Sequence, residues 1–109
     1  MCDLDVIFRA LADRKRRHVL ACLQEHHTVS LADLAEFVAG RESGGDATTV
    51  SAEVARDVYL SLYHNHVPKL EEADLLRYDQ ENDLVTRTED ADATLERVRD
   101  DLDDLLQEF

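Results

Sequence analysis

The stretch VSAEVARDVYLSLYHNHVPKLEEADLLRYDQENDLVTRT, residues 50–88, predicts a long helix followed by two short strands. Its first half has apolar residues at helical spacing, namely Val54, Val58, Tyr59, Leu62, Tyr63, Val67 and Leu70. Ser51 is a residue type that caps helix starts, so we expect the helix to begin near it. Pro68 lacks the backbone N–H that a helix interior needs, and we expect it to kink or split the helix.

The second half of the stretch predicts a β-hairpin. Leu76 and Tyr78 alternate with polar residues, DQEND at 79–83 supplies a turn, and LVT at 84–86 supplies the second strand.

Three shorter helices are expected before this stretch. Asp3 or Asp5 caps the first, whose apolar stripe consists of Leu4, Ile7, Phe8 and Leu11. Asp13 caps the second, which runs from residue 14 to about residue 26. The segment HTVS at 27–30 is β-prone. Ser30 and Asp33 resemble a capping box that opens the third helix, and Gly40 is expected to end it.

Residues 88–109 carry nine acidic residues against two arginines, yet they also carry an apolar seam. Its members recur at alternating spacings of three and four: Leu95, Val98, Leu102, Leu105 and Phe109. Such a seam predicts an amphipathic helix that must bury one face. We expect it to pair with a second copy of the chain, together with Leu4, Ile7 or Phe8 of the first helix.

The expected order is helix, helix, short strand, helix, helix, hairpin, helix. This is the order of a winged helix-turn-helix domain. The predicted fold is therefore mainly α with a small β-hairpin. The winged helix-turn-helix covers residues 1–87, and an added C-terminal helix covers residues 88–109.

Three segments resemble ArsR-type repressors, and together they span residues 10 to about 87. ALADRKRRHVLACL at 10–23 resembles their opening, which reads roughly ALADPTRRRILELL. SLADLAEFVAG at 30–40 resembles the first helix of their helix-turn-helix. SLYHNHVPKLEEADLL at 61–76 resembles STVSRHLKVLREAGLV, their recognition helix and its step into the wing. The chain also looks like the small winged-helix proteins without an assigned function that haloarchaea carry.

The resemblance implies a dimeric regulator that binds double-stranded DNA. It places Ser61, His64, Asn65 and Pro68 on the base-reading face, with Lys69 beside them. Asn65 can form two hydrogen bonds with the edge of an adenine base. The sequence also departs from the family pattern. Asn65 and Pro68 replace basic positions, Asp74 replaces a glycine, and the helix begins early with acidic residues.

The remaining cations are candidates for phosphate contacts. Arg14, Lys15, Arg16 and Arg17 form a basic run with His18, and Arg77 and Arg87 flank the hairpin. Each could grip the DNA backbone or lie on a solvated, acid-paired surface.

Composition points to a salt-rich cytoplasm. The chain carries 25 acidic and 12 basic residues, for a net charge of −13, and only two of the bases are lysines. High acid and scarce lysine resemble haloarchaeal proteins, and salt screens such repulsion. A DNA mimic is disfavoured because the acids are scattered. No secretion signal or membrane segment is expected.

Other chemistries find little support in the sequence. No nucleophile–base pair, phosphate-binding glycine loop or cofactor motif is present, so we expect no enzyme and no cofactor. His64 and His66 point about 200° apart on a helix and cannot share a metal ion. Cys22 lies in an apolar helical stretch, which favours a buried thiol over a redox switch. The alternative to a DNA-binding regulator is a winged-helix module that binds protein instead.

Overall fold

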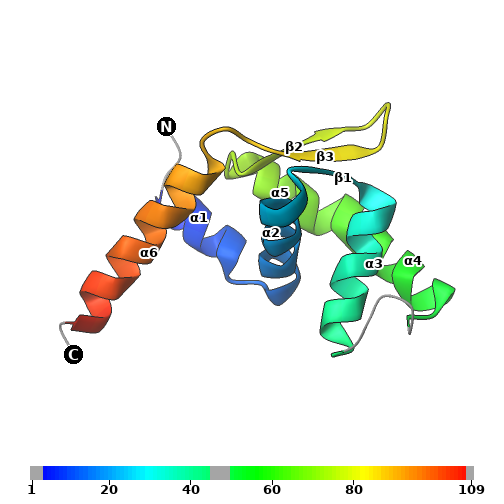
Figure 1. Ribbon diagram of the computed structural model, residues 1–109, viewed down its shortest axis with the longest axis horizontal. Coiled ribbons are helices and arrows are strands. Elements are labelled where there is room, and N and C mark those ends of the chain that lie inside the picture. The colour runs from blue at the N-terminus through cyan, green and yellow to red at the C-terminus, as the bar shows by residue number, and fades with distance from the viewer. Residues whose placement is uncertain (1–3, 45–49, 108–109) are drawn as a thin grey trace.

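The computed structural model describes the backbone of residues 4–44 and 50–107 and the side chains of residues 5–44 and 50–100. The described elements follow the predicted order (Figure 1): α1 (Leu4–Leu11), α2 (Arg14–His26), β1 (Thr28–Ser30), α3 (Leu31–Glu42), α4 (Ala52–Ser61), η2 (Leu62–His66), α5 (Val67–Glu72), β2 (Leu76–Asp79), β3 (Leu84–Arg87) and α6 (Ala91–Gln107). The chain is thus mainly helical with a small antiparallel sheet.

The sheet has three described strands in the order β1-β3-β2. The predicted hairpin is confirmed as β2 and β3, with Tyr78 opposite Val85. The β-prone segment before α3 adds β1, which places Val29 opposite Val85 from the other side. A third strand matters because an isolated two-stranded hairpin is marginally stable in water. The sheet lies along one edge of the helices (Figure 1).

Side chains of the predicted types cap three of the helices. The Asp13 carboxylate accepts the Lys15 N–H at 2.8 Å at the start of α2. Ser30 Oγ accepts the Asp33 N–H at 3.1 Å at the start of α3. Ser51 Oγ accepts the Val54 N–H at 3.2 Å at the start of α4. These bonds satisfy backbone donors that a helix start leaves unpaired.

The end of α3 differs from the prediction. Gly40 does not end the helix; it is buried inside it, and α3 continues to Glu42. Gly44 has the left-handed backbone, with φ +72°, and its N–H donates to the Arg41 carbonyl at 3.2 Å. A left-handed position favours glycine, so the helix ends where the backbone can turn.

Pro68 is accommodated by an irregular helical turn that precedes it. The helix runs on through α4, η2 and α5 (residues 52–72, here the long helix), but η2 is a π-helical turn. In it the Val67 N–H donates to the Leu62 carbonyl, five residues back. Proline cannot donate to the carbonyl four residues before it and crowds that carbonyl, so a widened turn accommodates the ring.

The core is built from leucine, valine and alanine, as the low aromatic content predicts. Its largest fully buried side chains come from α2, α3, the long helix and the start of β2: Leu23, Leu31, Leu34, Leu62, Leu70, Leu75 and Leu76. Each fully buried leucine contributes about 1.5–3 kcal/mol relative to an exposed one. This packing fixes the long helix against α3 and the hairpin.

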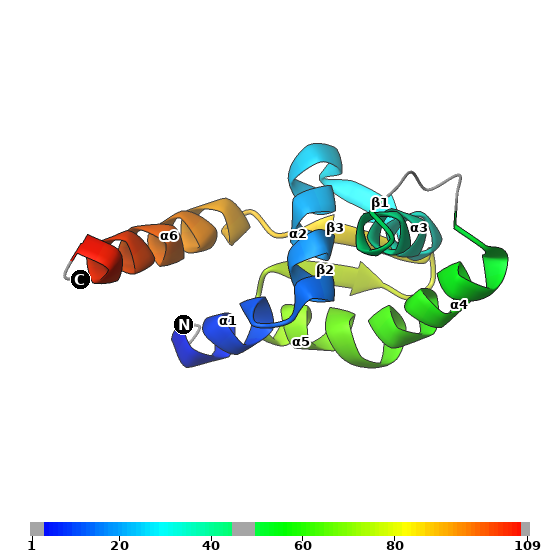
Figure 2. The same cartoon turned by 90° about the horizontal axis from the view of Figure 1, so that it is seen from below.

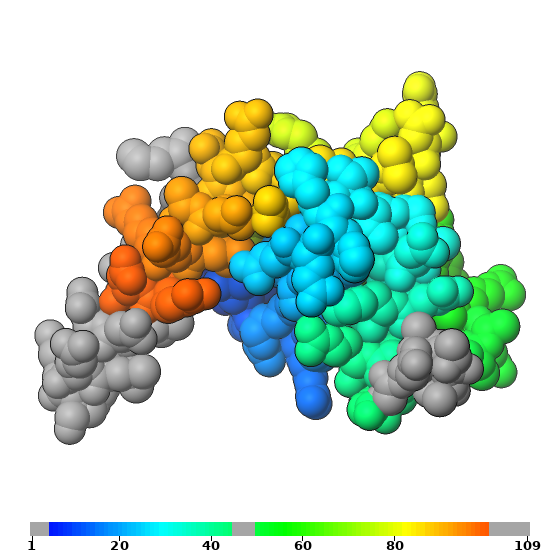
Figure 3. Space-filling view, in the orientation of Figure 1, coloured from blue at the N-terminus to red at the C-terminus, as the bar shows by residue number. Residues whose placement is uncertain are grey.

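The hairpin tip and α6 lie at opposite ends of the molecule (Figures 2 and 3). The C-terminal part of α6 projects beyond α1 in Figures 1 and 2. Leu95 packs against the core and Val98 is 3% exposed, so the first part of the seam is already covered in the single chain. The side chains of Leu4, Leu102 and Leu105, and all of Phe109, lie outside the described residues. Within the described residues, no helix is long and apolar enough to cross a membrane.

Candidate nucleic-acid interface

The middle of the long helix presents exposed polar residues without acids. His64, Asn65, Pro68 and Lys69 are exposed, and no Asp or Glu occurs between residues 58 and 70. The Tyr63 ring packs edge-on against the His64 imidazole, with ring centroids 5.0 Å apart. This stretch itself carries no carboxylate that would repel a polyanion, although exposed Glu71 and Glu72 follow it in the same helix.

Ser61 lies apart from this exposed surface. It is half-buried and lines a groove of about 480 Å³ between α3, α4 and the start of α2. The groove also contains Ala39, Val54 and Val58, so its floor is largely apolar. The π-helical turn after Ser61 widens the helix, so the even spacing that placed Ser61 with His64 and Asn65 does not apply through it.

The first turns of the long helix, unlike its middle, carry exposed acidic residues. Glu53 and Asp57 are exposed there, with Arg56 between them. The early start at Ala52 was expected from Ser51, and it brings these carboxylates next to the candidate interface.

The structure divides the basic run of α2. Arg14 is exposed, whereas Lys15 Nζ pairs with Glu42 Oε2 of α3 at 3.2 Å. Arg17 is exposed and donates a hydrogen bond to the Leu11 carbonyl at 2.8 Å. The run is therefore four side chains with separate surroundings and not one continuous cationic surface.

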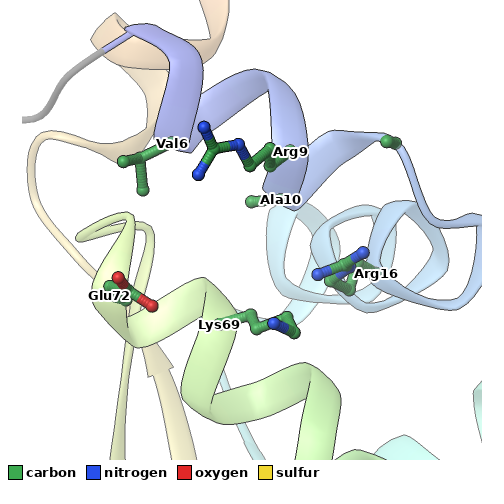
Figure 4. A pocket seen from close by; sticks show the side chains of 7 residues that line it. Val6, Arg9, Ala10, Arg16, Lys69 and Glu72 are labelled. Atoms are coloured by element: carbon green, nitrogen blue, oxygen red, sulfur yellow. The ribbon is translucent and has the colours of Figure 1, made fainter.

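Arg16 enters a pocket of about 440 Å³ between α1, α2 and α5. We call this the α1–α2–α5 pocket; it is lined by Val6, Arg9, Ala10, Ala12, Arg16, Lys69 and Glu72. Figure 4 shows the side chains of Arg9, Arg16 and Lys69 extending into the same space from three helices. Lys69 thereby joins this pocket to the exposed residues of the long helix.

His66 lies on the buried face of the long helix, as its angular separation from exposed His64 predicts. It is 4% exposed, and its Nδ1 lies 3.8 Å from Asp13 Oδ1. Burial lowers the pKa of His66, although the Asp13 charge opposes this effect. Burial raises the pKa of Asp13, but His66 and the Lys15 and Arg16 N–H groups outweigh it and hold that pKa below its ordinary value. The buried imidazole is neutral at neutral pH.

The hairpin offers little free positive charge. Arg77 lies 3.7 Å from the Asp74 carboxylate, and Arg87 lies 3.3 Å from that of Asp92. Both arginines lie at the base of the hairpin, in register with β-strand partners. The tip carries acids instead: Asp79, Glu81 and Asp83.

Two tyrosines tie the hairpin to the long helix. Tyr78 Oη of β2 donates to Asp83 Oδ1 at 2.6 Å, and Tyr59 Oη of α4 donates to the same oxygen at 3.2 Å. Burial and the Asp83 carboxylate raise the pKa of both phenols. The backbone of Asp83 has φ 55°, and its carbonyl accepts the Leu31 N–H at 3.0 Å. One turn residue therefore links the hairpin, α3 and α4.

A family model described as Domain of unknown function (DUF7344) matches residues 8–86. The chain belongs to this family. The match begins inside α1, ends inside β3 and leaves out α6. No curated protein and no solved structure matches the chain. The resemblance to ArsR-type repressors and to haloarchaeal proteins stays a prediction.

Two features of this DUF7344 domain escape sequence reasoning. Arg9 was not a candidate, because nothing in the sequence places α1 beside the end of the long helix. The Asp83 contacts with Tyr59 and Tyr78 join residues 24 and five positions apart, and no local pattern encodes the first.

Cys22 is buried, and burial raises the pKa of its thiol to about 11. Such a thiol is almost wholly protonated near neutral pH and is a poor nucleophile, as the apolar setting predicts. Among the described residues, no group of three or more histidine, cysteine, aspartate or glutamate side chains is placed to hold a metal ion.

Proposed function

We infer that this DUF7344 protein is a dimeric, winged-helix transcriptional regulator that binds double-stranded DNA. The observation that carries the proposal is the exposed, acid-free middle of the long helix, with His64, Asn65 and Lys69 on it. In this interpretation α3 and the long helix form the helix-turn-helix, and the β2–β3 hairpin is the wing.

Cations beside this surface support the proposal. Lys69 shares the α1–α2–α5 pocket with Arg16, and Arg14 is exposed two residues before Arg16 in α2. Contacts from such side chains to phosphates position a protein on DNA without reading sequence. The base-reading contact belongs to Asn65, whose amide can bond the N6 and N7 atoms of adenine.

The charge distribution sets the docking geometry. Glu53 and Asp57 would repel phosphates at the start of the long helix, and the acidic tip would repel them at the wing. We therefore place the middle of the long helix in the major groove, in contrast to helix-turn-helix proteins that read bases with the first turn.

Binding-site selection in molar potassium chloride tests the proposal. We expect an enriched motif, since base and shape contacts persist where counterion release contributes little. Asn65→Ala should relax discrimination at one base position by about 1–3 kcal/mol. Arg14→Ala with Arg16→Ala should weaken binding to all sequences and flatten the salt dependence. A selection that enriches no motif would contradict DNA reading.

The dimer is the second part of the proposal. The projecting C-terminal part of α6 supports it, because a helix with an apolar seam is marginal when unpacked in water (Figure 2). The partner would be a second copy, which pairs α6 with α6 through the seam around Leu102 and Leu105. Of the α1 residues expected to join it, Ile7 is 4% exposed and already buried in the single chain, whereas Phe8 is half-buried and can contribute.

Light scattering in molar salt tests the dimer. Leu102→Asp with Leu105→Asp should give a monomer, whereas Asp100→Asn with Asp101→Asn should tighten the dimer by removing repulsion. A wild-type monomer at tens of micromolar would rule the dimer out. A double leucine variant that stays dimeric would move the interface off α6.

Adaptation to high salt is the third part. With a net charge of −13, repulsion destabilises the compact chain, and the screening length falls from about 10 Å at 0.1 M salt to about 3 Å at 1 M. We expect the melting temperature in circular dichroism to rise from dilute buffer to molar potassium chloride. A melting temperature that is flat or falls with salt would contradict this adaptation.

A protein-binding module is the second candidate function. Val54 and Leu60 of α4 are 48% and 42% exposed, and Val54 borders the apolar groove that contains Ser61. The acidic hairpin tip also suits a basic protein partner better than DNA. Val54→Asp would abolish such binding and leave DNA affinity nearly unchanged, while Asn65→Ala would leave such binding unchanged and relax base discrimination.

A further inference from the structure

The α1–α2–α5 pocket concentrates positive charge in a strongly acidic protein. Arg9 of α1, Arg16 of α2 and Lys69 of α5 line it, and Glu72 is the one acidic residue among the described residues of the lining. The three cations come from two consecutive helices and from α5, which is distant from both in sequence, and they extend into a common space (Figure 4). Their formal charges, less that of Glu72, leave two positive charges in the pocket.

These cations are not used by the ion pairs of the described residues. Those pairs involve Lys15, His26, His66, Arg77 and Arg87, and none includes Arg9, Arg16 or Lys69. The Nε–H of Arg16 is buried and finds no acceptor among the described residues. Asp13 lies nearby, but its carboxylate accepts the Arg16 backbone N–H, at 3.4 Å.

A buried donor without a partner and three converging cations are both costly without an anion. Like charges repel, and an unsatisfied buried donor loses the hydrogen bond that it made to water. An oxyanion bound in the pocket relieves the repulsion between the three cations. Guanidinium groups bond phosphate oxygens in pairs, and the lysine ammonium adds a point charge.

We propose that the α1–α2–α5 pocket is a binding site for a phosphate group. A phosphate monoester near neutral pH carries up to two negative charges, which match the two positive charges of the lining. Val6, Ala10 and Ala12 give the pocket an apolar wall. At about 440 Å³ it has room for a small organic substituent as well as the phosphate.

Titration with inorganic phosphate at constant ionic strength tests the site, followed by calorimetry or by phosphorus NMR. We expect saturable binding that weakens roughly tenfold or more in Arg16→Gln and in Lys69→Gln, since each removes a charged contact. Arg56→Gln is the matched control, because Arg56 is exposed on the long helix that carries Lys69 and does not line the pocket. We expect it to change the affinity less than twofold.

Two further readouts sharpen the result. Phenyl phosphate should bind more tightly than inorganic phosphate, because the ring contacts the apolar wall. Melting temperatures of all variants check that they fold. If Arg16→Gln does not fold, Lys69→Gln still tests the site, because Lys69 is exposed and its substitution should leave the fold intact. The absence of saturable phosphate binding, or equal losses in Arg56→Gln and Arg16→Gln, would overturn the proposal.

The phosphate could belong to a free small molecule or to the DNA backbone, and competition distinguishes these sources. If phenyl phosphate displaces DNA, the pocket holds a backbone phosphate. If both bind together, the site takes a free phosphorylated compound. The titration contains no DNA, so its outcome is independent of the proposed DNA-binding function.

Discussion

Lys15 and Arg16 are neighbours in sequence, but their side chains face different helices and differ in whether an acidic side chain pairs with them. Lys15 turns towards α3 and pairs with Glu42 beside an apolar groove. Arg16 turns towards α1 and α5, into a pocket with Arg9 and Lys69. The first turn of α2 thus separates a neutralised side from a cationic side.

The comparison shows why a basic run in sequence is not a basic surface. Successive residues of a helix point about 100° apart, so neighbours face different elements. What each cation meets is set by the helix opposite it: α3 offers a carboxylate, whereas α5 offers another cation. The predictions below test how far the two sides differ.

The largest effect is expected in DNA affinity. Arg16→Ala combined with Lys69→Ala should weaken DNA binding about a hundredfold at low salt, since each charged hydrogen bond to a phosphate is worth about 1.5–3 kcal/mol. Lys15→Ala is the control, and we expect less than a threefold loss because Glu42 already neutralises Lys15. Fluorescence anisotropy with one duplex measures all three proteins. Equal losses from Lys15→Ala and the double variant would erase the distinction between the two sides.

A second test removes the cap that the two sides share. Asp13→Ala should lower the free energy of unfolding by about 1–2 kcal/mol, because the Lys15 and Arg16 N–H groups lose their acceptor. Asp13→Asn keeps an acceptor and should cost only a few tenths of a kcal/mol. Urea unfolding at fixed salt measures both. If Asn costs as much as Ala, the charge beside His66 matters more than the cap.

The third test uses pH, because His66 lies under this same turn. The pKa of His66 is lowered by burial, with Asp13 opposing and Arg16 and Lys15 adding to the lowering. The unfolded chain therefore takes up the proton first. The stability due to neutral His66 is complete above the ordinary imidazole pKa of about 6.5 and is lost as pH falls through it.

We expect His66→Gln to lose less of its melting temperature than the wild type between pH 7.5 and 5.5. Some slope should remain, because burial and the Arg41 charge lower the pKa of His18 too. Identical pH profiles for the two proteins would show that His66 does not resist protonation.

The smallest effect concerns the neutralised side itself. Lys15→Gln should reduce the free energy of unfolding by less than about 1 kcal/mol, because the Lys15–Glu42 pair is solvent-accessible. The loss should shrink further in molar potassium chloride. Glu42→Gln is the matched partner variant, and their double-mutant cycle isolates the pair. A coupling that grows with salt would mean that the ion pair is not what joins α2 to α3.

Local chemistry in the sequence determined the helix starts, the hairpin and the order of the elements. Asp13, Ser30 and Ser51 act through bonds that reach only two or three residues along the chain. Alternating and helical spacings are likewise local, so most of the buried face of the long helix could be predicted, although Val54 of that predicted face is 48% exposed. The prediction that Gly40 ends α3 was wrong, because Gly40 is buried within the helix and the left-handed turn falls at Gly44.

Only the tertiary structure decided which of these residues work together. Helix crossing brings Arg9 and Arg16 to Lys69, and no pattern in the sequence carries that geometry. Ser61, which ideal helical spacing assigns to the face of His64 and Asn65, is half-buried and lines a groove with residues of α3. Pairing, burial and charge neutralisation depend on distances between elements. A sequence therefore specifies its helices, while its binding surfaces appear only when those helices pack.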